Sequence, residues 1–583
     1  MAQTKPTEAS PAPARQRLPA WCIVLAAAAL VAGLGGRLWL TSLAPRWAYV
    51  WDHFDNIQMG RTATKHGLFR VYDVEPRSMP QIPGYAYAEQ AGGFIPYVRP
   101  GPRKVNYPPL GVTVFWLQSS LLRAVDPPGP NTIQAFKRER RELYPDPNYA
   151  PPEPPMLDDL TPVNTFTSRL VMSIAAVAAE LVAAVGVFLI ARMLAGPVWG
   201  LLAAVVCWLM PPLAMDSSFW GQTDAWFLAP AVFTIYMMLR GQRGLRPWVW
   251  AGALAAVTVL LKPHGLFLGP VVLFGAWVLP DRGRAPDWPV VFRRAGALIG
   301  AGAAALILIS LPWSIASGGA WVQEGYVANF TKYGDTTLKA FNVWYLDVLL
   351  LDGTIFDSGG APVFALDSKA TIMGIPKDAW GRLLALAAMA VAAWLVGRKY
   401  RHKGPTALVL FSALWVWSTF MWPTRVHERY IVYAIPLVTL AAVLLRRLWP
   451  AVLALAIVGT AELCHNVWLN PPPGTLLDKL GVRRTYEQAM ARYVQMGGRS
   501  SRYTAPTMEA AEKYEIDKAK HLRAEYLEQR KRTKGLEWLL LLISLGGYAW
   551  AFASPFAFSV SQAAADKPPP KPAKGHKPKR SRR

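Results

Sequence analysis

The chain has few charged residues, few cysteines and no internal repeat. Charged side chains make up 17% of its 583 residues, whereas soluble domains usually carry roughly 25%. The three cysteines, Cys22, Cys207 and Cys464, lie in or beside apolar runs, and none has a partner at metal-ligand spacing. The composition therefore argues against a soluble globular protein, and the cysteines argue against a disulfide framework or a zinc site.

Long apolar runs are present instead. Hydrophobic residues make up 53% of the chain, and several runs reach the roughly 20 residues that a helix needs to cross a bilayer. The sequence therefore predicts an all-α polytopic membrane protein with about 11–13 transmembrane helices. The candidate spans lie at 18–43, 108–125, 167–194, 198–215, 225–240, 248–262, 265–280, 294–316, 380–397, 405–422, 430–446, 450–468 and 536–557.

Polar segments flank and divide these runs. The first apolar run is too long for a typical signal-peptide core, so we expect an uncleaved first span. The stretch 44–107 that follows it forms a long first loop. We predict a disordered N-terminus at 1–17, a main transmembrane domain at 18–468, a charged helical segment at 469–535, a last transmembrane helix at 536–557 and a disordered basic tail at 558–583.

The basic residues lie mainly in short connectors. A formal net charge of +25 would suggest nucleic-acid binding in a soluble protein. Here Lys and Arg gather in the connectors 240–246, 282–294, 398–403 and 446–447 and in the tail, which places these connectors on the cytoplasmic face. We expect membrane lipids, and no nucleic acid, as partners. The connectors 220–224, 317–379 and 425–430 would share the opposite face.

The predicted spans 108–125, 167–194 and 198–215 raise a topological conflict. If 44–107 also lies on the outer face, three full crossings cannot connect it to 220–224. One of the three segments must therefore be re-entrant or broken. We favour 198–215, because Pro211 and Pro212 interrupt it and proline removes a helical hydrogen bond.

Two acids, Asp52 and Asp55, follow the first span. At a spacing of three residues their carboxylates share one helix face. There they could act as a general base or bind a divalent metal. An acid pair in a solvated loop is an equally weighted alternative, and the sequence permits a metal without requiring one.

A second polar group contains Trp220, Gln222 and Asp224. An indole, an amide and a carboxylate suit sugar hydroxyls, although Trp also anchors at membrane interfaces. Lys262 precedes a proline between two spans, where a lysine is costly unless it meets an anion. A lipid phosphate is a natural partner, with snorkelling to the headgroups as the alternative.

A third group contains Arg425, His427 and Arg429, in a connector assigned to the outer face. Basic residues are disfavoured on that face, and guanidinium groups bind phosphate bidentately, so we predict an anion site, with an ordinary charged connector as the alternative. Glu180 and Glu462 lie inside predicted spans and are functional candidates by default. A buried hydrogen bond to a neighbouring helix is an equal alternative for both.

Taken together and in this order, the motifs resemble those of the GT-C superfamily of membrane glycosyltransferases, in particular the bacterial branch related to the GPI mannosyltransferases. The resemblance covers roughly residues 20–450. It departs from the family pattern at Lys339, where an Asn is expected, and at His264, where a Gln is expected. The matching motifs are Asp52 with Asp55, then 67–72, 107–110, 220–224, 262–263, 339–344 and 427–430.

This resemblance implies a GT-C-like bundle and an inverting glycosyltransferase on the non-cytoplasmic face. The donor would be a polyprenyl-phosphate sugar, with mannose as the default and another hexose or pentose as alternatives. The acceptor would be a lipid or glycan. The Ala- and Arg-rich composition indicates a bacterial inner membrane.

The resemblance also implies roles for individual residues. The acid after the first span would deprotonate the acceptor, and the spacing to Gly67 favours Asp52 over Asp55; these two acids would also be the ligands of any metal. The donor phosphate would be bound by Arg425, Arg429, His427 and Lys262. The substrate pocket would contain Trp220, Gln222, Asp224, Asn342, Trp344, Glu428 and Tyr430.

Two other classes of function are compatible with the composition. A transporter or flippase of a lipid-linked or anionic solute would also need many spans, but such proteins often show repeated halves, and the candidate polar groups here cluster at one face. A membrane scaffold could use the charged segment 470–535 to bind a partner. Loss of transfer on removal of Asp52 would separate the enzyme from the scaffold.

Overall fold

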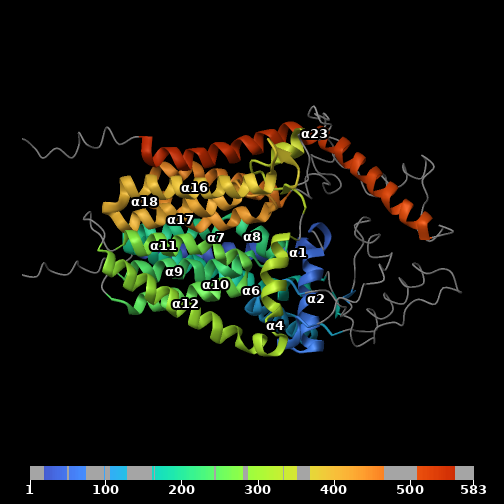
Figure 1. Cartoon of the computed structure of the whole chain (residues 1–583), viewed down its shortest axis with the longest axis horizontal. Helices are drawn as coiled ribbons and strands as arrows, with labels where there is room; N and C mark the ends of the chain where they lie inside the picture. Colours follow the sequence, from blue (N-terminus) through green and yellow to red (C-terminus); the bar gives the residue numbers. More distant parts are fainter. Residues whose placement is uncertain are drawn as a thin grey trace, which may run out of the picture.

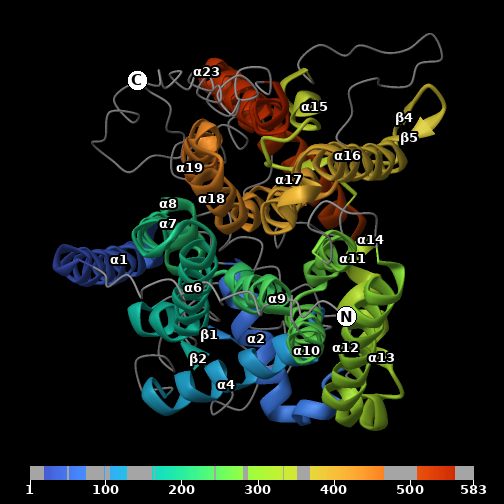
Figure 2. The same ribbon diagram turned by 90° about the vertical axis from the view of Figure 1, so that its left-hand side faces the viewer.

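The computed structural model describes residues 19–48, 51–73, 97–98, 105–127, 161–162, 165–241, 244–279, 287–331, 334–350, 368–464 and 508–557. This part of the chain is mainly helical, and most of its long helices run side by side in one bundle, seen from the side in Figure 1 and end on in Figure 2. The predicted disordered N-terminus and basic tail, and about half of the predicted first loop, lie outside the described residues.

The helices of the first half are α1 (Ala20–Trp47), α2 (Trp51–His66), η1 (Leu68–Arg70), α4 (Pro109–Val125), α6 (Phe166–Ala195), α7 (Pro197–Leu209), α8 (Pro211–Ala214), η3 (Met215–Phe219), η4 (Asp224–Phe227), α9 (Leu228–Arg240), α10 (Arg246–Leu261), η6 (Pro263–Phe267) and α11 (Leu268–Val278). Those of the second half are α12 (Trp288–Ser317), α13 (Ala320–Val322), η7 (Gln323–Val327), α14 (Ala328–Thr331), α15 (Tyr345–Leu350), α16 (Lys377–Tyr400), η8 (Arg401–Lys403), α17 (Gly404–Met421), η9 (Glu428–Ala434), α18 (Ile435–Leu444), η10 (Arg446–Leu448), α19 (Trp449–Leu463) and α23 (Met508–Ala557).

The prediction of an all-α polytopic membrane protein is confirmed. Each of the thirteen predicted spans contains a helix. In the described part of the chain, five helical segments are long and apolar enough to cross a membrane, and the bent pair formed by α7 and α8–η3 makes up to six. The shorter helices α10 and α11 are also apolar. The chain is therefore a multi-pass integral membrane protein.

The topological conflict is resolved by α4, not by the segment that we favoured. The span at 198–215 is broken as expected, with a bend of 46° between α7 and α8–η3. However, α4 lies across the end of the bundle (Figure 2). The Tyr107 hydroxyl before it contacts Thr223 Oγ1 at 2.9 Å, and Asp126 after it accepts a hydrogen bond from Thr165, the N-cap of α6. Both ends of α4 thus lie at one end of the bundle.

The turn between α6 and α7 explains why two apolar helices follow each other so closely. At its opposite end, α6 begins with a capping box formed by Thr165 and Ser168, which satisfies otherwise unpaired backbone donors. At the turn itself, Gly196 ends α6 with a φ of 96°, a conformation that glycine adopts without steric cost. Pro197 then opens α7, where a missing backbone N–H costs nothing. These signals reverse the chain at the far end of α6.

The predicted cytoplasmic connectors gather at the other end of the bundle. Lys399 donates to the carbonyls of Pro555 and Phe556 near the end of α23, and Arg447 donates to Ser554 O. The helix α23 is continuous across the predicted boundary at 535/536, and Figure 1 shows it projecting beyond the end of the bundle near α1 and α2. The part of the charged segment before Met508 lies outside the described residues.

Three small sheets join distant segments. Strand β1 (Tyr97–Val98) pairs antiparallel with β2 (Thr161–Pro162), and β4 (Thr371–Ile372) with β5 (Ile375–Pro376). Strand β3 (Thr337–Leu338) pairs in parallel with β6 (Val426–His427). This last pairing brings the predicted motif 339–344 beside the motif 427–430.

Candidate active site

Four of the predicted motifs meet at the end of the bundle that carries α2 and α4. They come from the start of α2, the connector before η4, the connector between α10 and η6, and the start of η9. The predicted sharing of one face by 220–224, 425–430 and the chain after the first span agrees with these contacts, since Arg429 reaches both Asp52 and Asp224.

Asp224 is the centre of this cluster. Its side chain is fully buried; Oδ1 is 2.5 Å from Lys262 Nζ and also accepts a hydrogen bond from the Tyr433 hydroxyl, and Oδ2 is 3.2 Å from Arg429 Nε. Burial alone would raise the pKa of Asp224, but Lys262 and Arg429 outweigh it and lower the pKa from 3.8 to about 2. The carboxylate is therefore ionised and paired with two cations.

Arg429 connects Asp224 to the more exposed Asp52. Asp52 Oδ2 is 3.2 Å from Arg429 Nη1 and accepts a second hydrogen bond from Gln222 Nε2 at 2.6 Å. The Asp52 side chain is 27% exposed, and its Oδ1 has no hydrogen-bond partner within the described part of the chain. One carboxylate oxygen is thus held, while the other is open to a ligand.

Asp55 lies one helical turn after Asp52 and is half-buried. The contacts with Gln222 and Arg429 are made by Asp52, which agrees with the preference for Asp52 as the base. Among the described residues, no group of three or more His, Cys, Asp and Glu side chains is placed to hold a metal ion. The metal role of Asp52 and Asp55 stays a prediction.

His427 and Glu428 directly precede Arg429, and both side chains contact its surroundings at the start of η9. His427 Nδ1 is 3.4 Å from Arg429 Nη1 and 3.6 Å from Glu428 Oε2. Burial and then the charge of Arg429 lower the pKa of His427 below 6.5. Burial would raise the pKa of Glu428, but the hydrogen bond and charge of His427, with Arg429, keep it below 4.5. At neutral pH the site therefore presents a neutral imidazole and a carboxylate.

Arg425 lies apart from the Asp52–Asp224 cluster. Its Nε donates to Ser368 Oγ at 3.2 Å, and its Nη2 is 3.6 Å from Asp378 Oδ2. Its φ of 63° is unusual for a residue other than glycine. The predicted role of Arg425 at the donor phosphate was not tested by this geometry and stays a prediction.

Three residues predicted for the substrate pocket donate side-chain hydrogen bonds to backbone carbonyls of neighbouring segments. Trp220 donates to Leu463 O at 2.8 Å. Asn342 donates to the carbonyls of Phe420 and Pro423, and Trp344 donates to Trp422 O at 2.6 Å. Through these bonds the 339–344 motif is attached to the C-terminal end of α17, close to β6.

Tyr430 contributes to an aromatic wall beside the cluster. Its ring centroid lies 4.2 Å from that of His264 and 5.2 Å from that of Tyr433, and Lys262 Nζ lies 5.6 Å from its centroid. His264, the departure from the family pattern, thus packs on two tyrosines. An ammonium next to tyrosine rings is stabilised by the ring quadrupole.

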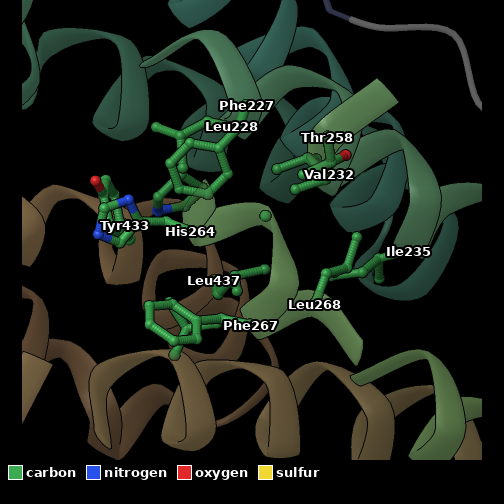
Figure 3. A pocket seen from close by; sticks show the side chains of 14 residues that line it. Phe227, Leu228, Val232, Ile235, Thr258, His264, Phe267, Leu268, Tyr433 and Leu437 are labelled. Carbon is green, nitrogen blue, oxygen red and sulfur yellow. The ribbon is translucent and has the colours of Figure 1, made fainter. Parts of the chain in front are cut away.

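An apolar pocket opens beside this wall (Figure 3). Figure 3 shows His264 and Tyr433 together on one side of it, with Phe227 and Leu228 next to them and Ile235 and Leu268 on the far side. The lining comes from η4, α9, α10, η6, α11, α17, η9 and α18. The pocket therefore connects an apolar space between spans to the charged cluster through His264 and Tyr433.

Several residues of the site were missed by sequence reasoning. Tyr433 follows the 427–430 motif by one helical turn. Arg169 and Asp216 are charged residues next to or within apolar runs, the same signal that selected Glu180 and Glu462. Asp216 is fully buried, and in the part of the chain that the structure describes neither of its carboxylate oxygens has a hydrogen-bond partner.

Glu180 and Glu462, the two acids predicted as functional candidates inside spans, each have a partner in the structure. Glu180 Oε2 is 2.6 Å from Arg37 Nη2. Glu462 Oε1 accepts a hydrogen bond from the backbone N–H of Phe341 at 2.5 Å. The alternative of a buried hydrogen bond to a neighbouring helix therefore holds for Glu180, whereas the partner of Glu462 lies in the 339–344 motif before α15.

Comparisons with known proteins give one match to a family model, over part of the chain. Residues 161–313 match the model of the family described as dolichyl-phosphate-mannose-protein mannosyltransferase. The chain resembles the GT-C membrane glycosyltransferases. This confirms, at the level of the superfamily, the resemblance seen in the motifs. The match includes the 220–224 motif and Lys262, and no curated protein matches the chain.

Two solved structures show limited likeness. ArnT from Cupriavidus metallidurans bound to undecaprenyl phosphate is 17% identical, with 92% of this chain and 76% of that chain covered and a TM-score of 0.41. The oligosaccharyltransferase of Archaeoglobus fulgidus in the apo form is 12% identical, with 86% and 56% covered and a TM-score of 0.38. Scores this low add nothing to the argument for function.

Proposed function

We propose that this protein is a membrane glycosyltransferase that moves a sugar from a polyprenyl-phosphate donor to a hydroxyl group of a lipid or glycan acceptor. The sugar is mannose or another hexose or pentose. The observation that carries the proposal is the bridge that Arg429 makes between the partly exposed Asp52 and the buried Asp224, beside an apolar pocket. The match to a mannosyltransferase family over residues 161–313 supports the same class of reaction.

Asp52 is the general base in this proposal. A sugar hydroxyl is a poor nucleophile and needs a positioned base to take its proton. Gln222 and Arg429 hold Oδ2 of Asp52, so the open Oδ1 accepts the proton as the acceptor oxygen bonds to the anomeric carbon. The bond from that carbon to the phosphate oxygen breaks on the opposite side, and the phosphate keeps the electron pair. The anomeric configuration is therefore inverted.

The charge of the cluster changes in step with this reaction. Before transfer, the charges of Asp52 and Asp224 balance those of Lys262 and Arg429. When Asp52 takes the proton, the cluster gains one net positive charge. At the same moment the departing lipid phosphate gains one negative charge. Fixed charges that meet a developing charge in a dry site are a large source of catalysis.

An apolar pocket lies next to this cluster. His264 and Tyr433 line it, and Tyr433 also binds Asp224. Its volume is about 30 Å³, so an isoprenoid chain would have to widen the pocket, and its phosphate would then lie near Lys262 and Arg429. Transfer would occur on the non-cytoplasmic face of a bacterial inner membrane, because the basic connectors lie at the opposite end of the bundle.

Sugar transfer from labelled polyprenyl-phosphate sugars tests the proposal, in membranes that contain the wild type, Asp52→Asn or Asp55→Asn at equal expression. Asp52→Asn keeps the size of the side chain and removes the base, so transfer should fall by roughly 10²- to 10⁴-fold. Asp55→Asn is the matched control on the same helix face and should lose much less.

Either of two outcomes contradicts the proposal. If Asp52→Asn transfers as fast as the wild type, the base is wrongly assigned. If the wild type transfers nothing from any common polyprenyl-phosphate sugar, the glycosyltransferase proposal fails. A transporter or flippase of a lipid-linked solute would then be the leading alternative.

A further inference from the structure

Arg169 lies behind the loop that carries Trp220, Gly221 and Gln222. It sits in the first turns of α6, and its side chain is fully buried. Its Nη1 donates to Trp220 O at 3.4 Å. It also interacts electrostatically with Asp52. Burying a guanidinium group in a membrane helix costs free energy, so we expect Arg169 to have a role beyond packing.

The loop next to Arg169 is held from two sides. Gly221 has a φ of 68°, and a Cβ built on it would lie 3.4 Å from His53 Nδ1 and 3.8 Å from Arg169 Nη1. On α2, Asn56 Nδ2 donates to Gly221 O at 3.3 Å. Arg169 and Asn56 therefore hold two successive carbonyls of the loop, and the backbone packs directly on the arginine.

The next residue of the loop contacts the proposed base. Gln222 Nε2 donates to Asp52 Oδ2 at 2.6 Å, so the position of the Gln222 amide, together with that of Arg429, orients the carboxylate. A displacement of the loop by about 1 Å would break this bond or turn Oδ1 away from the acceptor, and errors of this size are costly to catalysis. Arg169 thus influences Asp52 twice, through the loop and through its charge.

We propose that Arg169 is a positioning residue for the transfer reaction, which holds the 220–222 loop in place and, through Gln222, the carboxylate of Asp52. This rests on the proposed function. In this role Arg169 acts through the loop and not on the donor or the acceptor. Its loss should therefore affect kcat more than the KM for the donor.

Separate measurement of kcat and of the KM for the donor tests this inference with the wild type, Arg169→Gln, Arg169→Lys and the control Arg294→Gln. Arg294 is a buried arginine on α12 that stacks on Trp248, away from the cluster. Arg169→Gln loses the contact with Trp220 O, so its kcat should fall by about 10-fold or more while the KM for the donor stays unchanged. Arg169→Lys keeps a donor of the same charge and should recover much of kcat, and Arg294→Gln should leave kcat unchanged.

A second variant tests the loop without a change of charge and remains informative if Arg169→Gln does not accumulate as folded protein. Asn56→Leu removes the hydrogen bond from Asn56 to Gly221 O, and it should lower kcat with an unchanged KM for the donor.

The inference is overturned if Arg169→Gln raises the KM for the donor as much as it lowers kcat, if Arg169→Lys loses as much kcat as Arg169→Gln, or if Asn56→Leu leaves kcat unchanged. In each case the wild type still transfers sugar, whereas failure of the proposed function would leave the wild type inactive.

Discussion

Arg37 and Glu180 meet in the middle of α1 and α6, whereas Asp52, Asp224 and Arg429 meet at the end of the bundle. Both groups contain buried arginine–carboxylate pairs. Arg37 also donates to Gly33 O and Trp208 O and stacks 3.7 Å from the Trp208 ring centroid, and both side chains are at most 3% exposed. Arg429 instead divides its guanidinium between two acids, one of which is 27% exposed.

The difference separates a pair that joins helices from a cluster that can react. The Arg37–Glu180 pair has no access to solvent, so its contribution is to hold α1 against α6 and α7. In the other cluster the charges are shared, one carboxylate oxygen is open, and an apolar pocket lies alongside. Openness and shared charge therefore distinguish the proposed active-site cluster from the Arg37–Glu180 pair, and burial of an ion pair alone does not.

Removal of the shared arginine should have the largest effect on activity. Arg429→Met leaves both Asp52 and Asp224 without their common cation and removes a charge that meets the leaving phosphate. We expect transfer to fall by about 10²- to 10³-fold, the size seen when one transition-state donor is removed. The matched variant Arg37→Met should keep the rate per folded molecule. Sugar transfer normalised to folded protein measures both, and a similar loss in both variants would remove the distinction between the two groups.

The free energy of unfolding, unlike the transfer rate, should depend strongly on the buried Arg37–Glu180 pair. Arg37→Met leaves Glu180 buried and uncompensated, which should destabilise the protein by roughly 3–5 kcal/mol. The double variant Arg37→Met/Glu180→Leu removes both charges and should recover most of this loss, because apolar replacement of a buried pair is often neutral. Thermal unfolding in detergent is the measurement. A double variant as unstable as the single one would show that the pair itself stabilises the bundle.

The smallest expected effect is on the pH dependence of stability, through His427 beside Arg429. Burial and Arg429 lower the pKa of His427 below 6.5, so the folded protein binds this proton less readily than the unfolded chain. The stability linked to His427 is therefore fully present above pH 6.5 and decreases as the pH falls below that value. His427→Gln should flatten the fall in melting temperature below pH 6.5, whereas His402→Gln, at an exposed site near the opposite end, should not. An unchanged slope in His427→Gln would contradict the assignment.

The sequence predicted which residues form the cluster better than it predicted which of them contact one another. Asp52, Gln222, Asp224, Lys262 and Arg429 were each selected from local motifs, and the structure brings all of them together. A lipid phosphate was considered the natural partner of Lys262, yet its carboxylate partner in the structure is Asp224. A local motif identifies a costly charge, but the partner comes from another helix and depends on packing.

For other residues, too, the local motif did not predict the contact partner. Asn342 and Trp344 were expected in a substrate pocket, and they hydrogen-bond to the backbone at the end of α17. Arg425 is four residues from Arg429 but points to Ser368 and Asp378. Arg169 escaped notice because its partner, the carbonyl of Trp220, belongs to a loop more than fifty residues away along the chain. A backbone partner of this kind leaves no signal in composition or spacing.

The sequence by itself determined the class of the protein, the thirteen helical segments and the residue types of the site. These properties follow from local causes, since a long apolar run must be helical in a membrane and charged residues there need a reason to exist. Only the tertiary structure decided that α4 lies across the bundle end, that Arg429 joins Asp52 to Asp224, and that Glu180 is closed off by Arg37. Each depends on which distant side chains meet, because the energy of a buried charge is set by its partners and its access to water.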